Sequence, residues 1–196
     1  TLAMSRNIAQ RATGSISKEL LWKVYFESAQ VEERGAALAV KLDPTLNLND
    51  LLAPARKCFA LAVLSCPINL RWKVWLAGGR MELSASRSEI ARTLFARAYN
   101  EVPEKSKANV FLECARLEEQ VNDIPLARAI LTKARSECKS EWKVFLESVL
   151  LEVRLGRDAQ AIEICERALE IHEGTGRLWA MVVQLRQFDE GNNVGG

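Results

Sequence analysis

The sequence predicts an all-α solenoid in which antiparallel helix pairs follow one another as repeats. Three segments nearly duplicate one another, and they begin at Trp22, Trp72 and Trp142. Weaker copies begin at Ala108 and Trp179, so successive starts lie 50, 36, 34 and 37 residues apart. Copies at a period of this length are the signature of a stacked repeat fold. The sequence lacks the alternation of apolar and polar residues that marks a half-buried strand, which leaves helices as the repeated element.

Each copy begins with an amphipathic helix. An aromatic residue or a valine lies three residues after each start, and an acid lies ten residues after it. At about 100° per residue, offsets of 0, 3 and 10 share one face of a helix. The residues of this repeat signature are Trp22, Tyr25, Glu32, Trp72, Trp75, Glu82, Ala108, Phe111, Glu118, Trp142, Phe145, Glu152, Trp179, Val182 and Asp189.

A second helix is predicted between successive starts. Its four copies each begin and end with alanine, and they cover residues 55–62, 91–98, 127–134 and 161–168. In three of them an arginine follows the first alanine, namely Arg56, Arg92 and Arg128. Residues suited to an N-cap or to a first helical turn precede the copies. They are Asp50, Pro54, Ser88, Asp123, Pro125 and Asp158.

The repeats are expected to form one array over residues 1–196. The expected units are about 15–67, 68–103, 104–138, 139–173 and a partial unit at 174–190. The first spacing exceeds an ordinary repeat of about 35 residues by about 15, and we place this insertion at 35–49. Residues 36–40 suit a longer first helix, whereas residues 43–47 are typical of a loop. Residues 3–12 suit the second helix of a preceding repeat, and the chain is expected to be part of a longer protein.

Composition narrows the functional classes. Hydrophobic residues make up 48% and charged residues 27% of the chain, which is typical of a folded, soluble protein. The first residues lack the apolar stretch of a signal peptide, so we expect an intracellular protein. The 27 basic and 25 acidic residues leave a net charge of +2, short of a strongly basic nucleic-acid-binding domain. Five cysteines without a CxxC pair, and one histidine, argue against a zinc module or a catalytic triad. We therefore expect no catalysis, no metal, no cofactor and no membrane span.

The two-helix unit resembles the HAT (half-a-TPR) repeat. The likeness rests on the signature residues, on the second-helix arginines, and on Pro67 and Pro103 at the place of the proline that closes the HAT second helix. It covers residues from about 18 to 190, and it departs from the pattern at Ala108 and Ile162. The resemblance implies a non-catalytic, nuclear scaffold that binds other proteins in splicing, mRNA 3′-end processing or ribosomal RNA maturation. The alternatives are direct RNA binding along a basic face and a generic cytoplasmic adaptor.

The repeat signature itself is expected to be structural. A carboxylate on the same face as a buried tryptophan needs a partner, because an unpaired buried charge is very costly. Arg56, Arg92 and Arg128 are the natural partners, since guanidinium can bind carboxylate through two hydrogen bonds. The tryptophans are expected in the core rather than as platforms on which bases stack.

Two sets of residues are candidate contact sites. Lys23, Lys73 and Lys143 follow their tryptophans directly, and they form either a ladder for an acidic peptide or phosphate backbone, or a solvated face. On a solvated face, Lys23 and Lys143 would pair with glutamates four residues on, whereas Lys73 has an alanine at that place. On the last helix, Leu178, Trp179 and Val183 are candidates for an apolar interface. We expect a homodimer, or aggregation at high concentration, with residues 178–188 at or near the contact.

One pair of residues breaks a local rule. Gly78 and Gly79 lie inside a predicted helix, where two glycines cost about 2 kcal/mol relative to alanine. We expect close packing or a distorted helix at this point.

Overall fold

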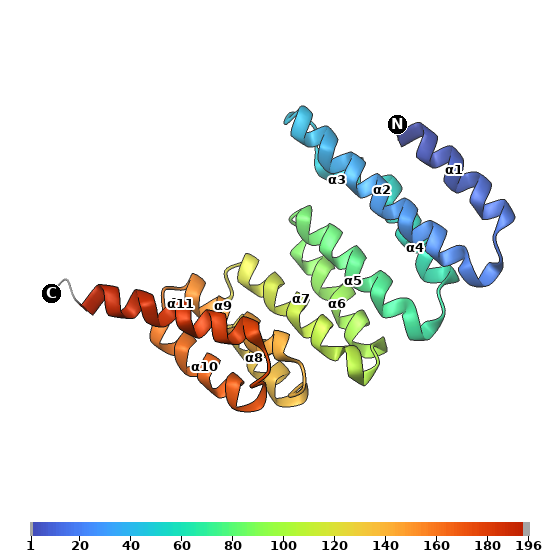
Figure 1. The fold of residues 1–196 in the computed structure, drawn as a ribbon. Coiled ribbons are helices and arrows are strands. Elements are labelled where there is room, and N and C mark those ends of the chain that lie inside the picture. Colours follow the sequence, from blue (N-terminus) through green and yellow to red (C-terminus); the bar gives the residue numbers. More distant parts are fainter. Residues whose placement is uncertain (1, 194–196) are drawn as a thin grey trace. The chain divides into compact units, whose positions relative to one another are not determined.

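The chain is built from helices (Figure 1). The computed structural model describes residues 2–193, with side-chain burial described as far as residue 187, and no strand occurs in the described range. The long helices are α1 (Leu2–Ser15), α2 (Leu21–Leu42), α4 (Ala53–Ser65), α5 (Ile68–Ser84), α6 (Ser88–Glu101), α7 (Lys107–Gln120), α8 (Ile124–Glu137), α9 (Trp142–Arg154), α10 (Asp158–Ile171) and α11 (Gly176–Asn193). The short ones are η1 (Lys18–Leu20), α3 (Leu48–Leu51) and η2 (Glu104–Ser106).

Helices adjacent in sequence pack in pairs within two compact units. The first unit is Thr1–Glu104 and the second is Lys105–Gly196. In the first unit α2 packs with α4 and α5 packs with α6, while α1 lies along α2. In the second unit α7 packs with α8 and α9 packs with α10, and α11 packs on α10. The predicted all-α solenoid of helix pairs is confirmed, and the continuity of all pairs in one array stays a prediction.

Three of the first helices end in the same way. A residue with positive φ lies fourteen residues after each start: Ser86 (61°), Asn122 (66°) and Gly156 (68°). The next amide N–H then donates to the carbonyl oxygen of the signature acid, from Arg87 to Glu82, Asp123 to Glu118 and Arg157 to Glu152. These bonds satisfy carbonyl groups that the last turn leaves free, which is the ordinary left-handed ending of a helix.

The first helix of the first repeat does not end at this position. Residue 36 is alanine, which is buried and helical, and α2 continues to Leu42. Asp43 then begins a loop, in which its side chain accepts hydrogen bonds from the backbone N–H and the hydroxyl of Thr45. Residues 35–49, where the insertion is predicted, thus form the end of a longer helix, a loop and the first residues of the short helix α3.

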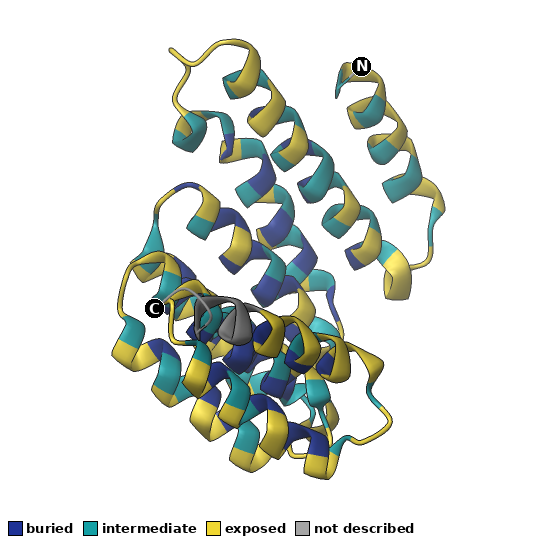
Figure 2. Cartoon of the chain, turned by 60° about the vertical axis from the view of Figure 1, so that its left-hand side comes forward, coloured by how far each residue is buried: buried dark blue, intermediate teal, exposed yellow. Residues whose placement is uncertain are grey.

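Alanine residues allow the paired helices to approach closely. The alanines that begin and end each second-helix pattern are 0% exposed. They are Ala55, Ala62, Ala91, Ala98, Ala127, Ala134, Ala161 and Ala168. Because an alanine side chain is only a methyl group, the face of the second helix that carries these alanines lies directly against the neighbouring helix. Larger apolar side chains fill the space on either side of the alanines. Figure 2 shows buried residues along the inner faces of the pairs.

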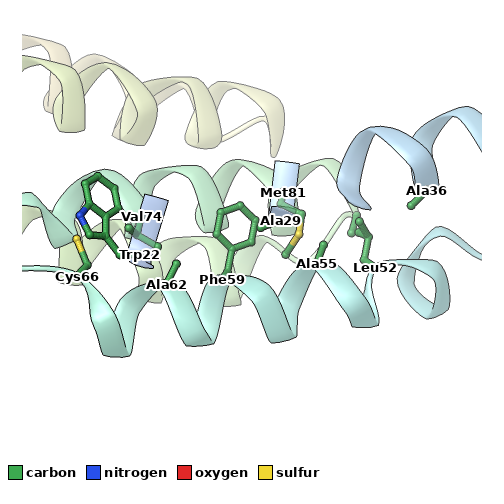
Figure 3. Close-up of a cluster of buried hydrophobic side chains, with 11 residues drawn as sticks. Trp22, Ala29, Ala36, Leu52, Ala55, Phe59, Ala62, Cys66, Val74 and Met81 are labelled. Carbon is green, nitrogen blue, oxygen red and sulfur yellow. The ribbon is translucent and has the colours of Figure 1, made fainter. Parts of the chain in front are cut away.

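The core of the first unit joins α2, α4 and α5. Figure 3 shows Phe59 of α4 beside Ala29 of α2 and Met81 of α5, in a cluster that also holds Trp22. The ring of Phe26 meets that of Phe59 edge to face at 6.1 Å, a geometry that aromatic pairs prefer.

The core of the second unit corrects the predicted alignment of the last repeat. Leu178 of α11 is 0% exposed and packs with Phe145, Val149 and Cys165, whereas Trp179 is 49% exposed. The position that a tryptophan occupies at the other starts therefore belongs to Leu178. The assignment of Trp179 to the repeat signature is wrong by one residue, because the buried face of α11 carries Leu178, Val182 and Leu185, at spacings of four and three residues.

Candidate functional site

Buried ion pairs join the second helix of one repeat to the first helix of the next. Arg56 of α4 donates from Nε and Nη2 to the two carboxylate oxygens of Glu82 on α5, at 2.7 and 2.9 Å. Arg128 of α8 binds Glu152 of α9 in the same two-point geometry, at 2.7 Å for both bonds. Glu82 and Glu152 are 4% and 5% exposed. Hydrogen bonding to these carboxylates raises the pKa of both arginines above their usual value.

A third pair involves an arginine that the sequence analysis missed. Arg6 of α1 donates from Nε and Nη2 to Glu32 of α2, at 2.6 and 2.7 Å. The signal was present in the spacing, because 26 residues separate Arg6 from Glu32 and also Arg56 from Glu82. The helix α1 therefore has the place of a second helix.

The remaining second-helix arginine and signature acid are Arg92 and Glu118. Arg92 contacts Glu89 on its own helix, three residues before it. Glu118 of α7 is 5% exposed and is buried like Glu32, Glu82 and Glu152. The signature acid Asp189 lies outside the residues whose side chains are described. Ile162 replaces the arginine in α10, as the sequence showed.

The signature aromatics divide between core and partly exposed positions. Trp22, Trp72, Phe111 and Phe145 are buried, while Tyr25, Trp75 and Trp142 are half-buried. The indole N–H of Trp75 donates to Glu101 at 3.1 Å. Arg97 stacks over the Trp75 ring at 5.2 Å. The Trp75 indole is thus held in place by α6, which leaves it poorly suited as a free platform for a base.

A second ionic cluster lies between the first helices α7 and α9. Glu147 of α9 is 8% exposed and accepts hydrogen bonds from Arg116 of α7 at 2.8 Å and from Arg154 at 3.0 Å. Arg116 also binds Glu113, and Arg154 binds Glu119 through two bonds. Burial acts to raise the pKa of Glu147, but the two arginines outweigh it and hold the pKa below its usual range.

The candidate lysines are exposed. Lys23 lies over the ring of Trp22 at 5.9 Å and Lys73 over that of Trp72 at 5.6 Å. Lys143 is exposed on α9. Each lysine is therefore accessible to an anion. The same exposure is expected for lysines on a solvated face, so it fits both interpretations.

The candidate interface on α11 is smaller than expected. Leu178 is in the core, so its assignment to an interface is wrong. Trp179 and Val183 are 49% and 53% exposed and lie one helical turn apart. The Trp179 indole N–H donates to the Glu173 carbonyl at 2.7 Å, which fixes the ring at the surface.

The described residues hold no group of three or more histidine, cysteine or acidic side chains placed to bind a metal ion. Burial, with Glu118 and Glu113 close by, raises the pKa of the Cys114 thiol to about 12. Burial likewise raises the pKa of the Cys165 thiol to about 11. Thiols with such pKa values are poor nucleophiles near neutral pH. From Leu2 to Asn193, no helix is both long and apolar enough to cross a bilayer.

Comparison with known proteins agrees with this architecture. A TPR-containing protein of Dictyostelium discoideum is 45% identical over 187 residues, which are 95% of this chain and 13% of that protein. The crystal structure of the APC/C hetero-tetramer Cut9-Hcn1 is similar in fold, with a TM-score of 0.50 and 10% identity over 94% of this chain and 46% of the other. Residues 1–194 match the PRP6, TPR-like domain. The expected resemblance to half-a-TPR repeats is confirmed, and the chain belongs to the PRP6 TPR-like domain family.

Proposed function

We propose that this TPR-like repeat scaffold is a non-catalytic, nuclear component of an RNA-processing complex, in which it binds other proteins. The family match over residues 1–194 carries the proposal, because PRP6 proteins are splicing factors. Pre-mRNA splicing is therefore favoured over mRNA 3′-end processing and ribosomal RNA maturation. The ion pairs support a scaffold role, since bidentate pairs between successive helix pairs fix the geometry of a surface without placing reactive groups in one cleft.

The proposal is tested by capture from nuclear extract after RNase treatment. The tagged chain should enrich splicing proteins over the components of other RNA-processing complexes. Capture by a variant with Glu in place of Lys23, Lys73 and Lys143 is compared with capture by the wild type. The three lysines are exposed, so their replacement should leave the core intact. Enrichment of unrelated cytoplasmic proteins alone would favour the generic adaptor.

Direct RNA binding is the second candidate function, and the exposure of the three lysines favours it. Electrophoretic titration with single-stranded RNA at two salt concentrations separates it from protein binding. Phosphate contacts make affinity fall steeply with salt, and each lost contact lowers that slope. The scaffold proposal expects weak binding that the triple lysine variant hardly changes. Tight binding that the variant abolishes would establish the lysine ladder instead.

A further inference from the structure

Four side chains form a cluster across the helix pair α5 and α6. Arg71 and Trp75 lie one turn apart on α5, and Arg97 and Glu101 lie one turn apart on α6. The Trp75 indole N–H donates to Glu101 Oε2 at 3.1 Å, and the Arg97 guanidinium lies over the Trp75 ring, 5.2 Å from its centre. Arg71 Nη1 lies 3.8 Å from Glu101 Oε1. The cluster therefore holds two guanidinium groups and one carboxylate.

Both guanidinium groups of this cluster lack hydrogen-bond acceptors. Among the residues whose side chains are described, none accepts a hydrogen bond from the side chain of Arg71 or Arg97. The 3.8 Å between Arg71 and Glu101 is too long for a hydrogen bond, although the Arg71 side chain is only 29% exposed. Because each guanidinium carries five N–H donors, both arginines are able to bind an acceptor group of another molecule.

The helix pair α7 and α8 contains a similar cluster with a different charge arrangement. The corresponding residues are Lys107 for Arg71, Phe111 for Trp75, Lys133 for Arg97 and Glu137 for Glu101. Lys133 lies over the Phe111 ring at 6.0 Å. The two oxygens of Glu137 lie 4.0 Å from Lys107 Nζ and 3.7 Å from Lys133 Nζ. In this pair the carboxylate is thus shared between both cations.

The indole N–H of Trp75 accounts for the difference between the two clusters. Phenylalanine has no N–H group, so Phe111 leaves both oxygens of Glu137 to the lysines. Trp75 instead donates to one oxygen of Glu101, and Arg97 lies over the indole ring without an ion pair to that carboxylate. The cluster on α5 and α6 is therefore open to a further anion.

An exposed apolar residue borders the open cluster. Ile68 lies three residues before Arg71 and seven before Trp75, so the three share one face of α5. Ile68 is 67% exposed. In the first and third repeats, the corresponding place holds Lys18 and Glu104. This surface therefore differs from the other two in offering an apolar contact beside its cations.

We propose that this surface binds an acidic segment of a partner protein, with carboxylates on Arg71 and Arg97 and an apolar side chain on Ile68. Charge complementarity favours carboxylates, because a guanidinium can bind one through two charge-assisted hydrogen bonds. RNA is disfavoured, since Arg97 covers the Trp75 ring on which a base would stack. The inference rests on the proposed role in protein binding and names the chemistry of one partner segment.

Titration with a synthetic peptide, followed by two-dimensional NMR of the isotope-labelled chain, tests this surface. The probe repeats the unit Glu-Glu-Leu four times, and a peptide of Gln-Gln-Leu units is its uncharged control. The glutamate peptide should shift the Trp75 Nε1–H and Arg71 Nε–H signals saturably, and the control should leave them in place. If both signals stay unchanged up to about 1 mM of the glutamate peptide, the proposal is wrong.

Substitution of the arginines identifies the contact. Arg71→Gln and Arg97→Gln should each weaken binding of the glutamate peptide by about tenfold, since each removes a charge-assisted contact. Arg167→Gln is the matched control, because Arg167 holds the place of Arg97 on α10 and pairs with Glu163. This control should bind like the wild type. Glutamine variants of Arg71 and Arg97 that also bind like the wild type would overturn the proposal.

Two further variants should change the affinity in opposite directions. Trp75→Phe removes the N–H that holds Glu101, so that Glu101 can pair with the arginines and binding should weaken although no charge has changed. Glu101→Gln keeps an acceptor for the indole and removes the competing charge, so binding should tighten by about fivefold. Circular dichroism melting curves check that both variants are folded. Tighter binding by Trp75→Phe, or weaker binding by Glu101→Gln, would contradict the proposed competition.

A double variant separates this inference from the proposed function and from RNA binding. Capture from nuclear extract is compared between the wild type and Arg71→Gln combined with Arg97→Gln, and the double variant should lose a subset of the captured splicing proteins. Capture of the same splicing proteins by both would overturn this contact and leave the proposed function standing. A wild type that binds the glutamate peptide but captures no splicing protein would contradict the proposed function alone. Tighter binding of an oligouridine than of the glutamate peptide, abolished in the double variant, would assign the arginines to RNA instead.

Discussion

Phe95 of α6 lies so close to the backbone of α5 that a Cβ atom added to Gly79 would come within 2.2 Å of Phe95 Cε1. Phe95 is 1% exposed, so its ring has no open space to move into. The adjacent Gly78 is different, because a Cβ atom there would meet Leu94 Cδ1 at an ordinary 3.7 Å. Close packing at Gly79 therefore accounts for a glycine in the interior of this helix.

The two glycines should respond in opposite directions to the same substitution. Gly79→Ala should lower the free energy of unfolding by about 1–3 kcal/mol, because overpacking outweighs the better helix propensity of alanine. Gly78→Ala should raise it by as much as about 1 kcal/mol, since only the propensity changes. Urea unfolding of the two variants measures both effects. Equal effects in the two variants would mean that Phe95 can move aside.

The sequence was sufficient to predict the helix pairs, because they depend on local periodicity. The starts of the first helices and the choice of the second-helix arginines as partners for the signature acids follow from spacing along one chain, and the structure shows the pairs Arg56–Glu82 and Arg128–Glu152. The sequence also identified Gly78 and Gly79 as two glycines inside a helix, where glycine is unfavourable. It could not separate close packing from a distorted helix, since that depends on where the Phe95 ring lies.

Loss of the Arg56 guanidinium should be strongly destabilising. Arg56→Met removes two hydrogen bonds from Glu82, which stays 4% exposed with Arg87 as a weaker partner at 3.3 Å. Breaking a buried pair from one side typically costs about 3–5 kcal/mol, because it leaves a buried charge. The remaining contact with Arg87 should keep the loss toward the lower end of that range. Chemical denaturation measures it.

The matched control for this prediction removes both charges. Arg56→Met combined with Glu82→Met leaves no buried charge at the site, and replacing a whole buried pair by apolar residues is often close to neutral. The double variant should therefore be more stable than Arg56→Met alone. A double variant less stable than Arg56→Met alone would contradict this explanation, because the loss in the single variant would then not come from an unpaired buried charge.

Two tryptophans should differ in their importance for stability. Trp72→Ala truncates a side chain that is 7% exposed, and such a change typically costs about 3–5 kcal/mol. Trp179→Ala removes a ring that is 49% exposed, and we expect a loss below about 1 kcal/mol. Thermal melting of the two variants gives the comparison. A Trp72→Ala protein with an unchanged melting temperature would mean that this ring is exposed in solution and is free to stack.

The parts that sequence analysis missed depend on positions that are close only in space. The cluster around Glu147 brings together α7 and α9, and the sequence offered Lys143, four residues away on the same helix, as the more obvious partner. The misalignment at Trp179 arose because a tryptophan outweighed the neighbouring Leu178 in the pattern. Arg6 was missed for a third reason, since the five residues before it are too few to show the first-helix pattern that marks a repeat.

Glu147 should give the stability of the protein a specific dependence on pH. Hydrogen bonds from Arg116 and Arg154 outweigh burial and hold the pKa of Glu147 below the usual value of 4.5 in the folded protein. A group with a lowered folded pKa stabilises the protein fully above its unfolded pKa, and this contribution is lost as pH falls through the folded value. The wild type should therefore exceed Glu147→Gln by a constant margin near neutral pH, of about 1–3 kcal/mol.

Urea unfolding between about pH 7 and about pH 3 measures that margin. It should narrow below about pH 4.5, because protonation of Glu147 in the wild type removes the same charge that the variant lacks. Glu163→Gln is the matched control, since Glu163 and Arg167 form an exposed pair four residues apart on α10. Exposed pairs of this kind contribute about 0.5 kcal/mol or less, so the control should stay close to the wild type throughout. A margin for Glu147→Gln that widens as the pH falls would mean that burial, rather than the two arginines, controls this carboxylate.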